Sequence, residues 1–340
     1  TGRQAVILID EYDKPLTDTI GQPELQEKIR SILQGLYGIM KKADRYIRFA
    51  FLTGVTRYGK LGIFSAANNT QDISMNDDFA SICGITEEEL RRYFDAEVEV
   101  FAKKQHVDKD AMYEMLKQKY DGYHFSSNSE DIYNPFSLLN SLKTRSLSNY
   151  WFATGTPTYL VTILKKKSYD LSKFSRGVTV MVESMTSFGN GDGSVIAALY
   201  QSGYLTIKSY DGKKYYRLGF PNEEVEDGFV QCLMEEYTVT TSGEIDEDLQ
   251  HLGSLISMGD INGFMTQIQQ IMSQIPFESN EPKLIEANFR NMLYLMIRST
   301  GHKVLVEYPV LGGRIDVFFQ TEQFAYVIEC KRDQSAAEAL

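Results

Sequence analysis

The sequence predicts a multidomain α/β protein, and three patterns along the chain indicate this. Two continuous apolar runs, 5–9 and 47–53, enclose a stretch with helical periodicity at 23–42. Buried strands joined by a helix are typical of a parallel sheet covered on both faces. The middle of the chain has mostly helical spacing, and a helix followed by three strand-like runs ends it. We therefore expect a partial parallel sheet, a helical and winged-helix-like middle and a C-terminal α/β domain.

The first domain, 1–155, is expected to continue from its sheet into helices. Thr86-Glu-Glu-Glu has the spacing of a capping box, in which a hydroxyl and a glutamate satisfy the first backbone N–H groups of a helix. The stretch 108–120 continues with helical period, and Asn134-Pro135 and Thr156-Pro157 each place a capping side chain before a proline. We interpret these residues as helix starts without a chemical role.

The second region, 156–240, is expected to contain a helix, a hairpin and a second helix. A helix at 195–201 precedes strands at 203–207 and 215–218, which the turn at Asp211-Gly212 joins. With a helix at 221–237 this order resembles a winged helix, and its acidic residues favour domain packing over DNA binding. A helical linker is expected at 241–280.

The C-terminal domain, 281–340, is expected to begin with a helix at about 282–300. Strand-like runs follow at 304–310, 314–319 and 325–330, and Gly312-Gly313 supplies the first turn. The stretch 335–340 begins another helix, which predicts that this domain is incomplete at its C-terminus.

Composition excludes several classes of protein. The 340 residues carry a formal net charge of -11, which argues against a protein that coats nucleic acid with its whole surface, because such binding neutralises phosphates with Lys and Arg. No apolar run approaches the roughly 18 to 20 residues of a membrane span. The three cysteines are widely separated, so we expect a reduced, cytoplasmic protein without disulfides or a thiolate zinc site. The four histidines lack metal-ligand spacing, so carboxylates are the expected metal ligands.

The run Ile7-Leu-Ile-Asp10-Glu11 ends a buried-type strand with two acids. This arrangement is a Walker B strand in P-loop ATPases, where the first acid coordinates Mg²⁺ and the second polarises a water molecule. An acidic pair after a strand is also common in capping or solvent-facing loops, so the pair alone does not decide between these roles.

A Walker A loop would support the ATPase interpretation, and one stretch resembles it in part. Gly54-Val-Thr-Arg-Tyr-Gly59-Lys60 follows the second apolar run. A Walker A loop needs Ser or Thr after the lysine and a helix beyond it, whereas Leu61 and Gly62 occupy these positions. We therefore do not interpret this stretch as a phosphate-binding loop.

Several longer strings identify a resemblance that spans nearly the whole chain. They are Val6-Ile-Leu-Ile-Asp-Glu-Tyr-Asp-Lys-Pro15, Phe51-Leu-Thr-Gly-Val55, Tyr120-Asp-Gly-Tyr-His-Phe125, Tyr133-Asn-Pro135, Ser202-Gly-Tyr-Leu-Thr-Ile207 and Pro221-Asn-Glu-Glu-Val225. With them the chain resembles the bacterial AAA-ATPase-like family that carries a C-terminal PD-(D/E)XK nuclease domain. The resemblance implies a P-loop ATPase-type sheet at the start and a restriction-endonuclease-like fold at the end.

For the first domain, the resemblance implies that the Walker A loop lies upstream of this sequence. Asp10 and Glu11 are then the Walker B pair, while Thr53 and Arg57 lie where a sensor detects the γ-phosphate. We expect ATP binding and hydrolysis in a longer parent protein but not in these 340 residues, and oligomers through the ATPase domain are possible.

The second chemical pattern is Arg314-Ile-Asp316 followed by Val327-Ile-Glu329-Cys-Lys331. Strand alternation places Glu329 and Lys331 on one face, and the preceding hairpin can bring Asp316 beside them. The two carboxylates and the main-chain carbonyl of Cys330 suit Mg²⁺ or Mn²⁺, and Lys331 can orient or deprotonate the attacking water. This is the PD-(D/E)XK pattern, and Glu286 on the preceding helix resembles the family's additional acid.

We therefore expect a metal-dependent nuclease joined to an ATPase-like module, with DNA, or else RNA, as its substrate. Asp316, Glu329, Lys331 and Glu286 are the expected catalytic residues. Two alternatives stay open: a non-catalytic module that binds nucleic acid or protein through a degenerate nuclease fold, and a protein whose ATPase half carries the activity. The acidic balance and the absence of an obvious basic channel favour the first alternative.

Overall fold

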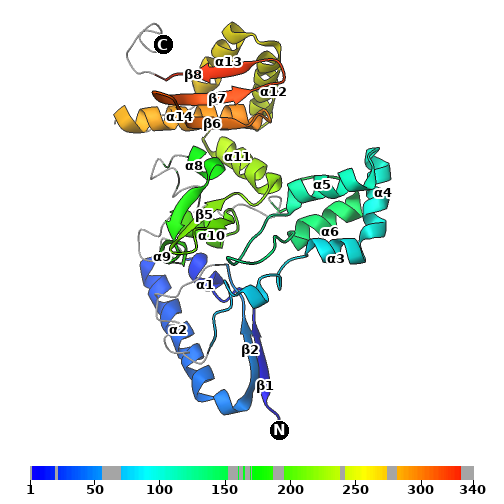
Figure 1. Ribbon diagram of the computed structural model, residues 1–340. Coiled ribbons are helices and arrows are strands. Elements are labelled where there is room, and N and C mark those ends of the chain that lie inside the picture. The colour runs from blue at the N-terminus through cyan, green and yellow to red at the C-terminus, as the bar shows by residue number, and fades with distance from the viewer. Residues whose placement is uncertain are drawn as a thin grey trace.

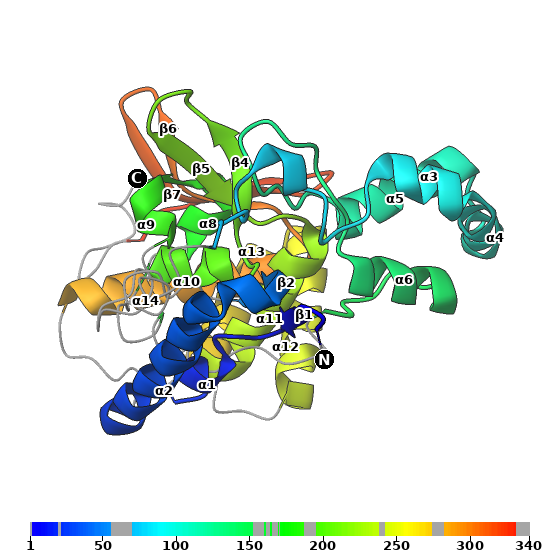
Figure 2. The same ribbon diagram turned by 90° about the horizontal axis from the view of Figure 1, so that it is seen from below.

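The computed structural model describes residues 2–19, 22–55, 70–151, 160, 164, 169, 171–186, 195–237, 242–273 and 282–330. Its elements form four groups that follow one another along the chain (Figure 1). We name them the N-terminal group (5–52), the helical lobe (87–144), the middle region (172–237) and the C-terminal region (242–330). Figures 1 and 2 show the middle region at the centre, with the helical lobe projecting to one side.

The N-terminal group is a strand–helix–strand unit. Its strands β1 (Ala5–Ile9) and β2 (Ile47–Leu52) pair in parallel, and helix α2 (Pro23–Lys42) connects them. A short helix, α1 (Lys14–Thr17), follows β1 directly. The parallel pairing is the one that the two apolar runs and the helical period between them predict.

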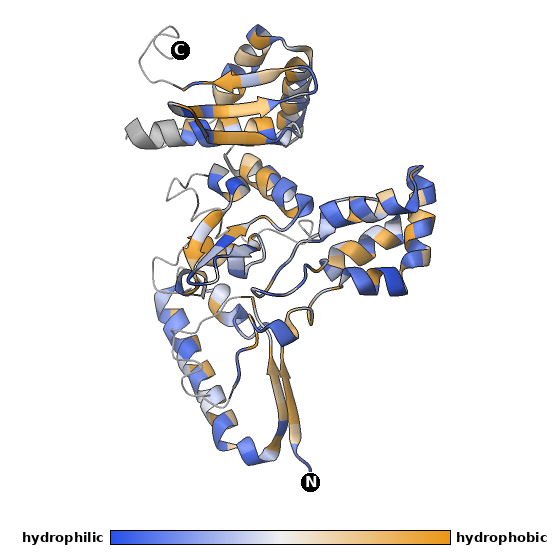
Figure 3. Cartoon of the chain, in the orientation of Figure 1, coloured by the Kyte–Doolittle hydropathy of each residue, from blue (hydrophilic) through white to orange (hydrophobic). Residues whose placement is uncertain are grey.

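Both strands are more exposed than the sequence predicts. Val6 is 59% exposed, Leu8 70% and Phe49 54%, although a continuous apolar run predicts burial on both faces. Figure 3 shows that β1 and β2 are apolar along most of their length. In the part of the chain that the structure describes, each strand pairs with only the other, so both outer edges of this sheet lack a neighbour.

The helical lobe has its own hydrophobic core. Its helices are α3 (Glu87–Tyr93), α4 (Asp95–Gln105), α5 (Lys109–Tyr120) and α6 (Pro135–Thr144). The predicted capping box is confirmed, because the Thr86 hydroxyl accepts from the Glu89 amide and the Glu89 carboxylate accepts from the Thr86 amide. Asn134 likewise caps α6 by accepting from two backbone amides. Phe101, Leu116 and other fully buried side chains pack inside the lobe.

The middle region contains an antiparallel sheet in the order β3-β5-β4. Its strands are β3 (Val178–Met181), β4 (Thr206–Tyr210) and β5 (Tyr215–Gly219). Its helices are α8 (Ser172–Arg176), α9 (Val182–Thr186), α10 (Val195–Gln201) and α11 (Glu223–Tyr237). The predicted helix, hairpin and second helix are present, whereas β3 was not predicted, because four residues show too little alternation.

The C-terminal region packs three helices against an antiparallel sheet. The helices are α12 (Ser242–Met258), α13 (Ile261–Ser273) and α14 (Pro282–Ser299), and the strands are β6 (Val304–Val310), β7 (Gly313–Gln320) and β8 (Ala325–Ile328). The predicted linker thus forms two helices of this region. Phe319 stacks on Tyr326 with ring centroids 4.5 Å apart, and Phe264 of α13 packs beside both.

The helical lobe is joined to the middle region by buried polar groups. The Asn222 side chain donates to the carbonyl of Asp121 at 2.8 Å, and in the segment that follows the lobe the Trp151 amide donates to the Glu224 carboxylate at 2.8 Å. Asp121 is only 4% exposed and Glu224 is fully buried. Burial disfavours the charged carboxylate, so it raises the pKa of Glu224 and raises the pKa of Asp121 to about 6.

Among the described residues, no helix combines the length and the apolar composition that spanning a bilayer requires.

The raised pKa of Asp121 predicts a specific dependence of stability on pH. Between the unfolded pKa near 3.8 and the folded pKa of about 6, the folded state binds the proton more tightly, so the free energy of unfolding decreases as pH rises through this window. We expect this contribution to reach at most about 3 kcal/mol. Asp121→Asn should remove it, so thermal unfolding of the variant between pH 4 and pH 7 should show a smaller decrease in midpoint than the wild type.

The control is Asp110→Asn, at an exposed position of α5 in the same lobe. This variant should keep the pH profile of the wild type. Identical profiles for all three proteins would contradict the assignment to Asp121.

Candidate functional site

The first candidate site lies where β1 and β2 end. The Thr53 hydroxyl, just after β2, donates to the Asp10 carboxylate at 2.5 Å, and the Glu11 amide donates to the same carboxylate oxygen at 2.9 Å. Glu11 has a φ of +49°, a left-handed conformation that is uncommon for residues other than glycine. Parallel strands end at the same edge of a sheet, and the structure thus brings together Asp10, Glu11 and Thr53 from positions 43 residues apart.

A third acid at this edge, Asp13, is not among the predicted site residues. Asp13 is only 2% exposed, and its carboxylate accepts from the Val55 amide at 3.1 Å. A side chain at Gly54 would place its Cβ 2.5 Å from this carboxylate, so only glycine fits there. Burial and the Asp13 charge together raise the pKa of Tyr37 on α2. Asp13 therefore ties the segment after β2 to the segment after β1.

The second candidate site lies at one edge of the C-terminal sheet. The Cys330 amide, two residues after β8, donates to the Asp316 carboxylate on β7 at 2.7 Å. The register pairs Val317 with Ile328, so Glu329 follows directly beside Asp316. Both acids are partly exposed. In Figure 1 the end of β8, the start of β7 and the N-terminal end of α14 lie at the same edge of this sheet.

Several predicted site residues are not described by the structure. Arg57 and Lys331 lie outside the described residues, and so does the side chain of Glu286, whose backbone belongs to α14. Among the described residues, no three His, Cys, Asp or Glu side chains form a group that could hold a metal ion.

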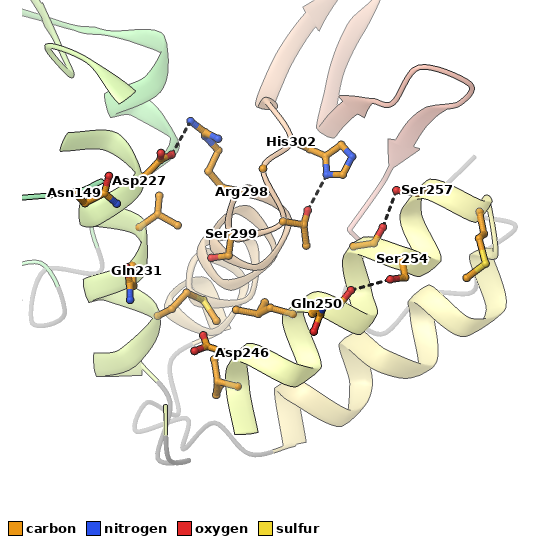
Figure 4. A pocket seen from close by; sticks show the side chains of 18 residues that line it. Asn149, Asp227, Gln231, Asp246, Gln250, Ser254, Ser257, Arg298, Ser299 and His302 are labelled. Atoms are coloured by element: carbon orange, nitrogen blue, oxygen red, sulfur yellow. Dashed lines mark hydrogen bonds and ion pairs between the residues drawn. The ribbon is translucent and has the colours of Figure 1, made fainter. Parts of the chain in front are cut away.

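A cavity of about 1200 Å³ opens between α11, α12 and α14, away from both candidate sites (Figure 4). Arg298 of α14 lines it and forms ion pairs with Glu226 and Asp227 of α11 at 2.9 and 3.8 Å. His302 also lines the cavity and lies just before β6. The first residue of β6 pairs with Phe319, near the C-terminal end of β7. None of the predicted site residues lines this cavity.

Two family models match the chain. The model of predicted AAA-ATPases matches residues 1–64, and the model of the PD-(D/E)XK nuclease superfamily matches residues 284–340. The first match contains Asp10, Glu11 and Thr53, and the second contains Asp316 and Glu329. The predicted combination of an AAA-ATPase-like region with a C-terminal PD-(D/E)XK nuclease region is therefore confirmed.

A curated protein of Azotobacter chroococcum mcd 1, described as "Uncharacterized protein in vnfD 5'region", is 31% identical over 336 residues. The match covers 97% of this chain and 62% of the relative, so the chain spans about three fifths of the relative's length. No solved structure matches the chain.

The buried Asp13 carboxylate predicts a local loss of stability when it is removed. Asp13→Ala removes the acceptor of the Val55 amide from a partly buried hydrogen bond to a charged group, which should cost about 1 to 3 kcal/mol. We expect faster hydrogen exchange of the amides at 53–55 and a lower unfolding midpoint. Asp13→Asn keeps an acceptor oxygen and should recover most of the loss.

The matched control is Asp18→Ala. The Asp18 side chain is 61% exposed and lies 3.8 Å from Lys14, a surface ion pair whose removal should change stability by less than about 1 kcal/mol. Equal exchange rates in Asp13→Ala and the wild type would show that the Asp13 contact does not hold this segment.

Proposed function

We propose that the C-terminal region is a metal-dependent nuclease that hydrolyses phosphodiester bonds of DNA. The observation that carries this proposal is the hydrogen bond between the Cys330 amide and Asp316, which brings the acid of β7 beside the segment that contains Glu329. The match of residues 284–340 to the PD-(D/E)XK nuclease superfamily supports it.

In this proposal the carboxylates of Asp316 and Glu329 and the main-chain carbonyl of Cys330 would hold Mg²⁺ or Mn²⁺. A divalent ion in such a site supplies Lewis acidity and a more acidic bound water. Because the Cys330 amide takes one Asp316 oxygen, it fixes the orientation of this carboxylate. Lys331 would position the attacking water and stabilise charge on the scissile phosphate, and Glu286 would add a carboxylate from α14.

We propose a regulatory, nucleotide-binding role for the N-terminal group. Asp10 would ligate the Mg²⁺ of bound ATP and Glu11 would orient a water, while Thr53 and Arg57 would sense the γ-phosphate. The parallel pairing of β1 and β2 and the hydrogen bond from Thr53 to Asp10 support this assignment, as does the family match of residues 1–64. ATP turnover and oligomer formation belong to the whole protein and are part of this proposal.

We propose that the chain is divided into a first domain at 1–155, a second region at 156–240, a helical linker at 241–280 and a C-terminal domain at 281–340. The winged-helix interpretation of the middle region is also a proposal, supported by the order α10, β4, β5 and α11. Four acids near the start of α11, Glu223, Glu224, Glu226 and Asp227, favour packing over DNA contact there.

The nuclease proposal predicts metal-dependent cleavage that depends on the named residues. With Mg²⁺ or Mn²⁺ the protein should cut plasmid and linear DNA, and EDTA should abolish cutting. Asp316→Asn and Lys331→Gln should each lower the rate about 100-fold or more, because each removes a group that acts on the transition state. Supercoiled, linear and single-stranded substrates assayed on gels would measure this.

Glu322→Gln is the matched control, since Glu322 is an exposed acid in the β7–β8 turn of the same sheet. This variant should cut at the wild-type rate. Equal rates for Asp316→Asn, Lys331→Gln and the wild type would show that the catalytic assignment is wrong.

Titration with Mn²⁺ tests the non-catalytic alternative. The nuclease proposal predicts calorimetric binding of Mn²⁺ at millimolar or lower concentration, weakened by Asp316→Asn and by Glu329→Gln because each removes a charged ligand. A protein that binds DNA but no Mn²⁺ in this range would instead be a non-catalytic binding module.

A further inference from the structure

Three arginines from different elements meet at Glu307 of β6. Arg290 of α14 donates to one oxygen of its carboxylate at 2.8 Å, and Arg314 of β7 donates to the other at 3.1 Å. Arg176, the last residue of α8, donates to the main-chain carbonyl of Glu307 at 3.3 Å. We call these four residues the arginine cluster. It carries more positive than negative charge, because it contains three guanidinium groups and one carboxylate.

The arginine cluster lies beside the candidate nuclease site. Arg314 precedes Asp316 by two residues on β7, so both side chains belong to the same face of the strand. Arg290 follows Glu286 by four residues on α14, which places the two positions on one face of the helix. Two of the three arginines are thus neighbours of proposed catalytic residues on the same elements.

The backbone of Glu307 is strained where the arginines meet. Its φ is +49°, a left-handed conformation inside a β-strand. Such a conformation costs a non-glycine residue about 1 to 2 kcal/mol and is more frequent at functional sites. The surrounding contacts of this residue therefore hold it in a conformation that an isolated strand would avoid.

The cluster has the chemistry of a phosphate-binding site. Each guanidinium has five N–H donors in a planar fork that matches a carboxylate or a phosphate, and the Glu307 carboxylate lies where two such forks meet. Arg314 is 68% exposed and can turn toward a ligand, whereas Arg290 is 18% exposed and is held in place.

We propose that Arg176, Arg290 and Arg314 bind the phosphate backbone of the DNA strand whose scissile bond lies at Asp316. Glu307 gathers the arginines when DNA is absent, and its charge lowers the affinity of the cluster for phosphate. The inference rests on the proposed nuclease function for the identity of the ligand, but binding can be measured without cleavage.

The experiment measures DNA binding by the full chain in EDTA, where no metal-dependent cleavage occurs. Fluorescence anisotropy with a labelled duplex of about 20 base pairs gives the affinity at several salt concentrations. Arg314→Gln and Arg290→Gln should each weaken binding about threefold or more. Each should also make the negative slope of log affinity against log salt shallower by about one. Glu307→Gln should change both quantities in the opposite direction, because it removes a negative charge from beside the phosphate.

Two exposed residues of α3 supply the controls. Arg92→Gln and Glu88→Gln make the same changes of charge on the helical lobe. Both should bind DNA with the affinity and salt dependence of the wild type, so that any effect of the cluster variants is local rather than due to net charge.

A purely structural ion-pair network predicts a different set of results. In that case Glu307→Gln would lower the unfolding midpoint together with Arg290→Gln and would not strengthen binding. These results for Glu307→Gln and Arg290→Gln would overturn the proposal. A wild type that does not bind DNA would also overturn it, as would an unchanged affinity and salt slope in both arginine variants.

The failure of this inference can be told apart from the failure of the nuclease proposal. Binding that depends on the arginines in a protein that does not cut DNA with Mg²⁺ or Mn²⁺ would support the cluster and contradict the nuclease. Cleavage that depends on Asp316, with unchanged DNA affinity in the arginine variants, would support the nuclease and contradict the cluster.

Discussion

The first turn of α11 imposes the constraint on which the arrangement of the chain depends. Polar groups removed from water must find partners inside the protein. Asn222 donates to the carbonyl of Asp121 and so fixes the helical lobe to the middle region, while the fully buried Glu224 accepts from the amide of Trp151, in the segment that follows the lobe. Two residues after Glu224, the Glu226 carboxylate is bound by two nitrogens of Arg298 of α14. One helix thus sets the positions of the groups on either side of it.

Hydrogen bonds to carboxylates also define both candidate sites, although Asp10 is exposed and Asp316 is partly exposed. Asp10 directly follows β1 and Asp316 lies inside β7, and each receives a hydrogen bond from the segment that follows the neighbouring strand. A donor that occupies one carboxylate oxygen orients the other one before any ligand binds. Sheet pairing therefore does more than bring the acids near their partners, since it also fixes the direction of their side chains.

The sequence predicted local structure well and long-range contacts poorly. β6 has the bounds that its apolar pattern predicts, and the capping box at Thr86 forms, because both depend on neighbouring residues. The parallel crossover was predicted, and it brings Thr53 within hydrogen-bond distance of Asp10, a contact that was not predicted. Asp13 was missed, since its partner Val55 is 42 residues away and a buried acid has no distinct pattern in the sequence. The arginine cluster was missed for the same reason, because Arg176 and Glu307 are separated by 131 residues.

The composition of the arginine cluster bears on how the proposed activities would be connected. Arg176 belongs to the middle region, whereas Arg290 and Arg314 belong to the C-terminal region, so the cluster is complete only when the two regions keep this arrangement. The ion pair between Arg298 and Glu226 holds the same two regions together near the C-terminal end of α14. A rearrangement of the middle region would therefore withdraw one of three phosphate ligands without moving Asp316 or Glu329. Affinity for DNA would change while the proposed catalytic acids stayed in place, so the middle region would regulate the proposed nuclease through binding rather than through catalysis.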